Sequence, residues 1–191
     1  TQVWKRLYDE GKLNEAQSHF WKTKPAEELY DLEKDPDEVN NLVGSKKHQE
    51  ILNQMRKAHR EHVTKIRDVG FLPEGEIHER SKGSTPYEMG HDDKKYPFKK
   101  IHAAADMASS MRSKDVLAIT KLLDDDDSAV RYWGALGLLM QEKAGVKKGH
   151  AKLLEALNDK SPYVRIIAAE ALGKYGSKDD VAKAVETLGK T

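Results

Sequence analysis

The sequence contains no cysteine, which excludes disulfide bridges, cysteine-ligated metals and thiol catalysis. It also lacks any apolar run near the ~20 residues needed to span a bilayer. Neither charge dominates, because 33 basic residues are balanced by 32 acidic ones, and we therefore expect neither nucleic acid nor a membrane as partner. No signal peptide is recognisable. Because the chain begins at Thr1 without a methionine, we expect it to be a piece of a longer protein.

What the sequence does contain is mostly helical pattern. Residues 1–22 predict two short helices broken at Gly11, and residues 46–68 predict the longest helix, with apolar residues on one face. Polar and apolar residues alternate over 27–32, which predicts a short, half-buried strand. Residues 82–97 contain two prolines, two glycines and no period, so we expect a linker loop and a domain boundary there.

Residues 98–191 are rich in alanine, leucine and valine and contain an internal repeat. The stretch from Leu122 is similar to the one from Ala156, 34 positions later. Each copy predicts an acidic or proline-containing turn, a helix with one apolar stripe and a second helix. A degenerate copy precedes them, so the pattern predicts about three helix pairs. The positions shared by the two copies include Leu123 and Leu157, Asp125 and Asp159, Val130-Arg131 and Val164-Arg165, and Leu138 and Leu172.

Tetratricopeptide and ankyrin signatures are missing, and the pattern D-x-x-x-x-V-R-x-x-A/G-A-x-x-L instead resembles HEAT-like repeats in their short form. The resemblance implies a structural ladder of ion pairs between stacked repeats, in which Arg131 goes with Asp125 and Arg165 goes with Asp159. The alternative is that these arginines bind an anionic ligand. We favour the structural role because each arginine has an aspartate to pair with.

The stretch PAEELYDLEKDPDEVNNL, residues 25–42, is similar to the C-terminal subdomain of sulfatases, in the alkaline phosphatase superfamily. In that family an E-L-Y-D-L strand, a D-P-x-E turn and an N-L step lead into a final amphipathic helix, and the order and spacing match here. The combination with a HEAT-like tail is most similar to heparan N-sulfatase (sulfamidase-like) proteins of bacteria. We therefore predict a mostly α fold, in which a small α+β remnant of a sulfatase C-terminal subdomain, residues 1–81, precedes a HEAT-like α-α solenoid, residues 98–191.

The resemblance also implies which chemistry to expect in the parent enzyme. Sulfatases hydrolyse sulfate esters or sulfamates with a formylglycine made in a C/S-x-P-x-R sequence, next to a divalent cation, usually calcium. Both belong to the large N-terminal domain, so we expect no catalytic, cofactor or metal residue in this chain. Ser84-Thr85-Pro86 begins such a sequence, but Glu88 stands where arginine is required, and no metal-bearing strand precedes it.

Other candidate sites have simpler structural interpretations. His59 and His62 could begin a metal site, but His59 falls on the apolar stripe, where packing is expected. His91-Asp92-Asp93 fits a turn as well as a cation site. The aspartates at 124–127 lack the glycine and glutamate of an EF-hand and suit a helix start.

Two further features concern surfaces. A basic patch, formed by Lys94, Lys95, Lys99 and Lys100, could steer a sulfated glycan, although a solvated surface is the default interpretation. Trp133 lies on the predicted apolar stripe beside Gly134 and Gly137, which suggests close helix approach, with the sulfatase-like part as a possible neighbour.

Two functional hypotheses remain open. In the first, the chain is a sulfatase C-terminal fragment, inactive alone, whose repeats bind protein and whose first part binds its own upstream catalytic domain; sulfated glycans are then substrates of the parent only. In the second, it is a non-enzymatic helical-repeat scaffold that retains a sulfatase remnant. Self-association through the repeats or an unpaired strand is a further expectation. The resemblance implies a periplasmic or secreted parent.

Overall fold

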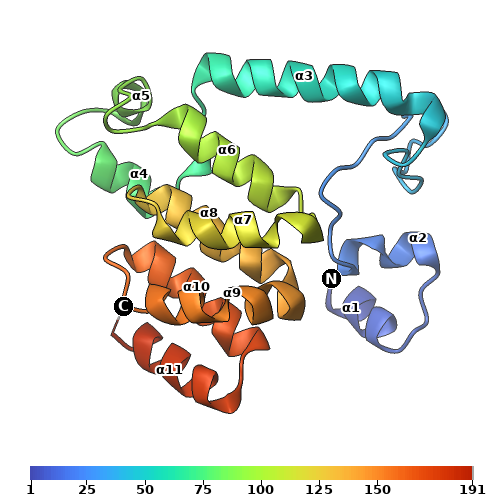
Figure 1. Ribbon diagram of the computed structural model, residues 1–191. Coiled ribbons are helices and arrows are strands. Elements are labelled where there is room, and N and C mark those ends of the chain that lie inside the picture. Colours follow the sequence, from blue (N-terminus) through green and yellow to red (C-terminus); the bar gives the residue numbers. More distant parts are fainter. Residues whose placement is uncertain (191) are drawn as a thin grey trace. The chain divides into compact units, whose positions relative to one another are not determined.

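The computed structural model describes residues 1–190, and within that range the secondary structure consists of helices and turns without any strand (Figure 1). The chain forms two compact units, residues 1–61 and 62–191, and the division falls within helix α3 (Gln49–Ile66). Among the described helices, none is long and apolar enough to cross a membrane.

The first unit contains α1 (Gln2–Asp9), α2 (Glu15–Ser18), a 3₁₀ turn at His19–Trp21, another at Lys46–His48 and most of α3. Gly11, at φ +66°, takes the left-handed conformation that ends α1, so the predicted break is confirmed. Asn14 begins α2 with a capping box, in which its side chain and that of Gln17 each accept a backbone N–H.

The strand predicted at 27–32 does not form, and this prediction is wrong. The segment is irregular and bonds to the segment around residue 42 through one backbone pair, from the Leu42 amide to the Leu29 carbonyl at 2.8 Å. A strand needs a ladder of such bonds with a neighbour. The alternation of polar and apolar residues therefore marks a half-buried segment here and not a β ladder.

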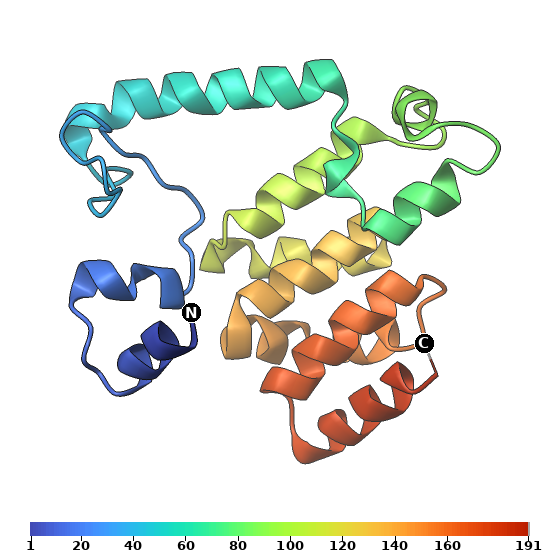
Figure 2. The same ribbon diagram turned by 180° about the vertical axis from the view of Figure 1, so that it is seen from behind.

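The second unit holds the repeats and the segment before them. Its elements are α4 (Glu74–Arg80), α5 (Pro86–Gly90), α6 (Phe98–Ser109), α7 (Val116–Lys121), α8 (Ser128–Met140), α9 (Glu142–Ala156), α10 (Pro162–Tyr175) and α11 (Lys178–Leu188). The pairs α6 and α7, α8 and α9, and α10 and α11 are the three predicted helix pairs. The first helices of the pairs pack on one another in order, as do α7 and α9 (Figures 1 and 2).

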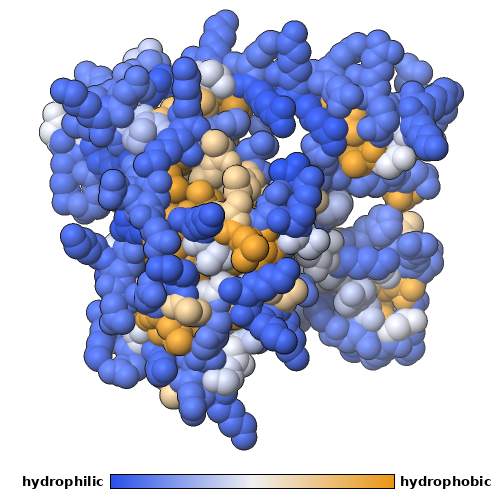
Figure 3. Space-filling model, in the orientation of Figure 1, coloured by the Kyte–Doolittle hydropathy of each residue, from blue (hydrophilic) through white to orange (hydrophobic). Residues whose placement is uncertain are grey.

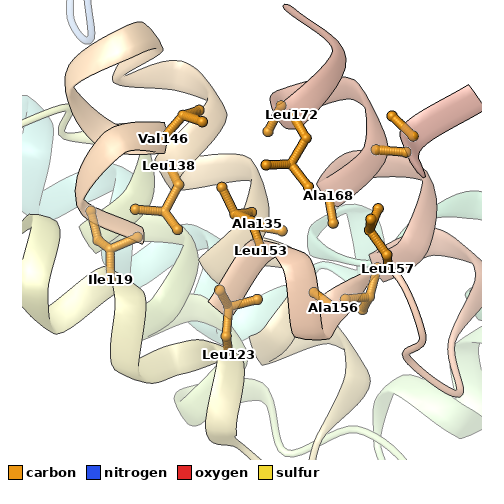
Figure 4. Packing of buried hydrophobic residues seen from close by; sticks show 14 of the residues in the cluster. Ile119, Leu123, Ala135, Leu138, Val146, Leu153, Ala156, Leu157, Ala168 and Leu172 are labelled. Atoms are coloured by element: carbon orange, nitrogen blue, oxygen red, sulfur yellow. The ribbon is translucent and has the colours of Figure 1, made fainter. Parts of the chain in front are cut away.

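The core of the repeats is one continuous cluster that runs from α7 to α11. Leu138, Leu153 and Leu172 are completely buried in the successive helices α8, α9 and α10, with alanines such as Ala135 and Ala168 beside them (Figure 4). Gly149 leaves room for Leu138, whose methyl carbon would lie 2.3 Å from an added Cβ. The stacking therefore depends on small residues at the helix contacts.

The expected linker at 82–97 is part of the second unit, so the predicted boundary differs from the observed division after Glu61. Thr85 caps α5 in this stretch, and the side chains of Met89 and Tyr96 are completely buried. They join a second cluster with Phe98, Ile101 and other residues of the first repeat. Proline and glycine at 82–97 thus shape tight turns around buried anchors.

The long helix α3 also differs from its predicted amphipathic form. Of its expected apolar stripe, Leu52 and Val63 are buried, whereas Met55 is 55% exposed and Ile66 is 46% exposed. His59 is exposed as well, and the prediction that it is packed is wrong.

Candidate functional site

The repeats place a buried ion pair between successive copies. The guanidinium of Arg131 in α8 donates from Nε and Nη2 to the two carboxylate oxygens of Asp159, at 2.7 and 2.8 Å. The side chains retain 15% and 11% of their exposure. This fork-to-fork geometry is the strongest arrangement available to an arginine and a carboxylate. Arg131 and Asp159, 28 positions apart, therefore tie one repeat to the next.

Within a copy, the arginine contacts backbone carbonyls and not the aspartate side chain. Arg131 Nη1 donates to the carbonyls of Asp125 and Asp126 at 2.8 and 2.9 Å. Arg165 repeats this geometry with the carbonyls of Asp159 and Lys160 at 2.9 and 3.3 Å. Each arginine thus closes the turn that precedes its own helix.

The carboxylate of Asp125 has a different partner from the one that the spacing suggests. It pairs with Lys100 of α6 at 2.7 Å and accepts the Asp127 amide at 2.8 Å. Lys100 belongs to the degenerate first repeat, so this lysine and Asp125 connect the first and second repeats as Arg131 and Asp159 connect the second and third. Sequence comparison missed Lys100 because the first copy diverges most.

Charge and burial oppose each other at Asp159. Burial raises the pKa of its carboxyl, but hydrogen bonds from Arg131 and from the Ser161 amide outweigh that effect, and the pKa lies below its usual value. The ionised form is therefore the one that the folded repeats stabilise.

A second buried cluster joins α4 to α8 and was not expected from the sequence. Arg80 donates to Glu76 Oε1 at 2.6 Å and to Asp127 Oδ1 at 2.8 Å, and Ser128 also contacts Glu76. Burial raises the pKa of the Asp127 carboxyl, but the hydrogen bonds from Arg80 and the Ala129 amide lower it by more, so the pKa lies below its usual value. The available signals were the i, i+4 spacing of Glu76 and Arg80 and the helix-capping position of Asp127.

Trp133 also fastens the preceding segment to the repeats. Its indole N–H donates to the Phe71 carbonyl at 2.8 Å, and its ring packs on the second hydrophobic cluster. Gly134 and Gly137 allow close approach of the loop after α7 and of Ala108 in α6, where an added Cβ would lie 3.0 and 2.9 Å from neighbouring side chains. The close approach is therefore made by the repeats themselves, while Trp133 contacts the segment predicted to belong to the sulfatase-like part.

In the first unit, two side chains organise the stretch that resembles sulfatases. The buried carboxylate of Asp35 accepts the amides of Val39 and Asn40, at 3.1 and 2.8 Å. The side chain of Asn41 accepts the Leu29 amide and donates to the Glu27 carbonyl, both at 3.1 Å. These bonds hold the two arms of the stretch together without a sheet, which explains why the pattern requires aspartate and asparagine at these places.

The residues around Ser84 are used in helix capping. Thr85 and Glu88 form the capping box of α5, and the Ser84 hydroxyl donates to the Ser81 carbonyl at 3.3 Å. Residues 1–190 contain no group of three histidine or acidic side chains placed to hold a metal ion.

The remaining candidates have ordinary partners. Asp93 pairs with Arg67 at 2.7 Å, and His91 Nδ1 lies 2.8 Å from the Tyr87 carbonyl. In the acidic run, Asp127 caps α8 and Asp124 pairs with Lys152. Of the basic patch, Lys100 is occupied by Asp125, whereas Lys94, Lys95 and Lys99 are exposed.

Comparison with known proteins assigns the two parts of the chain separately. Residues 15–65 match the family model described as N-sulphoglucosamine sulphohydrolase, C-terminal, and residues 116–191 match that of HEAT repeats. An ulvan-active sulfatase of Formosa agariphila is 42% identical over 73 residues, which are 38% of this chain and 12% of that protein. No solved structure matches.

The chain thus spans a small fraction of the length of the curated relative that it matches. The matched segments coincide with the stretch organised by Asp35 and Asn41 and with the stacked helix pairs. Residues 15–65 are therefore similar to the C-terminal part of a sulphohydrolase, and residues 116–191 form HEAT repeats.

Proposed function

We propose that this chain is the C-terminal part of a sulfatase, inactive by itself, in which residues 1–61 pack on the catalytic domain and the repeats provide an interaction surface. The similarity of residues 15–65 to the sulphohydrolase C-terminal family carries this proposal. The formylglycine and the divalent cation, calcium by resemblance, then belong to the catalytic domain.

The first unit buries few hydrophobic side chains and exposes several large ones, as expected of a segment that packs against another part of a longer protein. Leu29 and Leu52 are the only buried hydrophobic side chains in residues 1–61, all of which are described, and neither hydrophobic cluster lies there. Phe20 is 62% exposed and Val3 is 61% exposed. Apolar surface is visible over α1 and α2 in the space-filling view (Figure 3).

An aromatic group dominates this exposed surface. Trp4 stacks on Phe20 with ring centroids 4.9 Å apart, and Trp21 meets both edge-on. The indole nitrogen of Trp21 is buried without an acceptor among residues 1–190. Such a group is costly in isolation and suits an interface in which additional chain supplies contacts.

The decisive experiment compares this chain with the longer parent protein in an aryl-sulfate hydrolysis assay. We expect no turnover from residues 1–191 and turnover from the parent. Turnover by the chain alone would refute the placement of the catalytic groups. A parent without a C/S-x-P-x-R sequence before Thr1 would leave the helical-repeat scaffold as the function.

The packing of residues 1–61 has its own test in the parent. Phe20→Ala removes an aromatic side chain at the proposed contact and should lower the parent's thermal stability, by about 3 kcal/mol if the ring is fully covered. Tyr87→Ala is the matched control, because that ring is 73% exposed in α5 of the other unit. Equal effects of the two substitutions would contradict the proposed contact.

A further inference from the structure

One face of the repeats carries lysines that take no part in the ion pairs described above. Lys114 precedes α7, Lys121 ends it, and Lys143, Lys147 and Lys148 lie on α9; all five are exposed. Helices α7 and α9 pack against each other, so their exposed sides form one surface.

The helical period places the α9 lysines on the outer side. The buried residues of this helix include Gly145, Val146, Gly149 and Leu153, which face the core. At 3.6 residues per turn, Lys143, Lys147 and Lys148 point in the opposite direction. The 34-residue repeat places Lys114 at the position equivalent to Lys148, so neighbouring repeats present lysines at the same level.

These five lysines differ in their pairing from the cations on the first helix of each pair, α6, α8 and α10. Lys100, Arg131 and Lys174 each hold a carboxylate at 2.6 to 2.7 Å. In the described part of the chain, none of the five lysines has an ion pair or hydrogen bond from its side chain. Within residues 1–190, their charge is therefore not neutralised.

Few acidic groups oppose this charge. Asp124 and Glu155, at one end of the face, are both bound by Lys152 at 2.7 Å, and Asp115 is bound by Arg112. Glu142, exposed at the start of α9, has no ion pair among residues 1–190. The exposed Ala144 lies between Lys143 and Lys147 on α9, and Leu117, 68% exposed, lies between Lys114 and Lys121 beside α7.

We propose that this face, formed by Lys114, Lys121, Lys143, Lys147 and Lys148, binds a sulfated polysaccharide. The choice of a sulfated polymer rests on the proposed sulfatase function, and the lysines supply the complementary charge. Lysines spread over two packed helices suit an extended polyanion, whose repeated charges can meet several of them at once.

The test measures binding of the 191-residue chain to dextran sulfate, with unsulfated dextran as reference. We expect binding to dextran sulfate alone, and binding that weakens strongly between about 50 and about 200 mM salt. The triple variant Lys143→Gln, Lys147→Gln, Lys148→Gln should bind about tenfold more weakly. The matched control Lys94→Gln, Lys95→Gln, Lys99→Gln removes the same charge elsewhere and should change affinity less than about twofold.

Several outcomes would overturn the proposal. These are equal losses in both triple variants, equal binding of dextran, or tighter binding of double-stranded DNA or polyglutamate than of dextran sulfate. Both variants alter exposed side chains, and unchanged melting curves establish that they fold. Because the readout is binding without turnover, a negative result leaves the sulfatase proposal untouched, and an inactive parent leaves this one untouched.

Discussion

Removing the carboxylate of Asp159 would break the connection between the second and third repeats. In Asp159→Ala, Arg131 keeps its two backbone carbonyl acceptors but loses both carboxylate bonds, and the Ser161 amide loses its acceptor. Asp159→Asn separates these effects, because an amide oxygen can still accept from Ser161. The comparison therefore isolates the charge from the turn.

The exposures set the expected magnitude. Breaking a fully buried pair costs about 3 to 5 kcal/mol, whereas exposed pairs are worth about 0 to 1 kcal/mol. With 15% and 11% of exposure left, Arg131 and Asp159 lie near the buried limit. Since Arg131 retains two acceptors, we expect a coupling energy of about 2 kcal/mol in a double-mutant cycle of Arg131→Met and Asp159→Ala.

Urea unfolding followed by circular dichroism measures each corner of the cycle. The control is the cycle for Lys174 and Glu170 in α10, a pair of 2.6 Å whose side chains are 59% and 40% exposed. Its coupling should stay below about 0.5 kcal/mol. Equal coupling energies in the two cycles would refute the inference that burial and fork geometry make the pair between repeats strong.

Three further outcomes are expected. Gly75→Ala should destabilise the chain by about 1 to 3 kcal/mol, because its Cβ would lie 1.8 Å from the Tyr163 hydroxyl. In a Tyr163→Ala background, where the clash is removed, the same substitution should stabilise α4 by up to about 1 kcal/mol. If thermal melts show destabilisation in both backgrounds, the clash is not the cause. Trp133→Phe should cost about 1 to 2 kcal/mol in urea unfolding, because the Phe71 carbonyl loses its donor; a neutral effect would show that water replaces the indole. The hydrogen bond from the Ser177 amide lowers the pKa of the Asp180 carboxyl from its usual 3.8 to about 2, so the ionised carboxylate stabilises the fold above pH 3.8 and this stabilisation is lost as the pH falls toward 2. Between pH 3.8 and 2, the melting temperature of Asp180→Asn should therefore fall less than that of the unsubstituted chain. Parallel curves for the two proteins would contradict this prediction.

The helices of the repeats were predictable because apolar spacing of 3.6 residues recurs after 34 positions, and each copy supports the interpretation of the other. The strand at 27–32 was not, since alternation reports half-burial and cannot tell whether a neighbouring strand exists. Side-chain bonds from Asn41 do there what a ladder would do. The boundary predicted at 82–97 differs from the observed division for a similar reason. Single buried residues such as Met89 and Tyr96 produce no periodic pattern in the sequence, so the segment resembles a linker.

The ion pairs show the same limit at the level of single contacts. Sequence spacing identified Arg131 and Asp159 as members of a ladder but placed Arg131 with Asp125, whose carboxylate pairs with Lys100 instead. Lys100 and Arg80 were missed because the first repeat diverges and α4 precedes the repeats altogether. Charged partners far apart in the chain become visible only when packing has brought them together.

The contacts of Trp133 with Phe71 and of Arg80 with Asp127 have a practical consequence for dividing the protein. A fragment starting at Pro97, where the repeat pattern begins, would lose the donors and rings that cover α8 and would expose the surface now shielded by Met89 and Tyr96. The compact unit that contains the repeats starts 35 residues earlier, at His62. Residues 62–97 therefore cover part of the helical stack in the way that terminal capping repeats do.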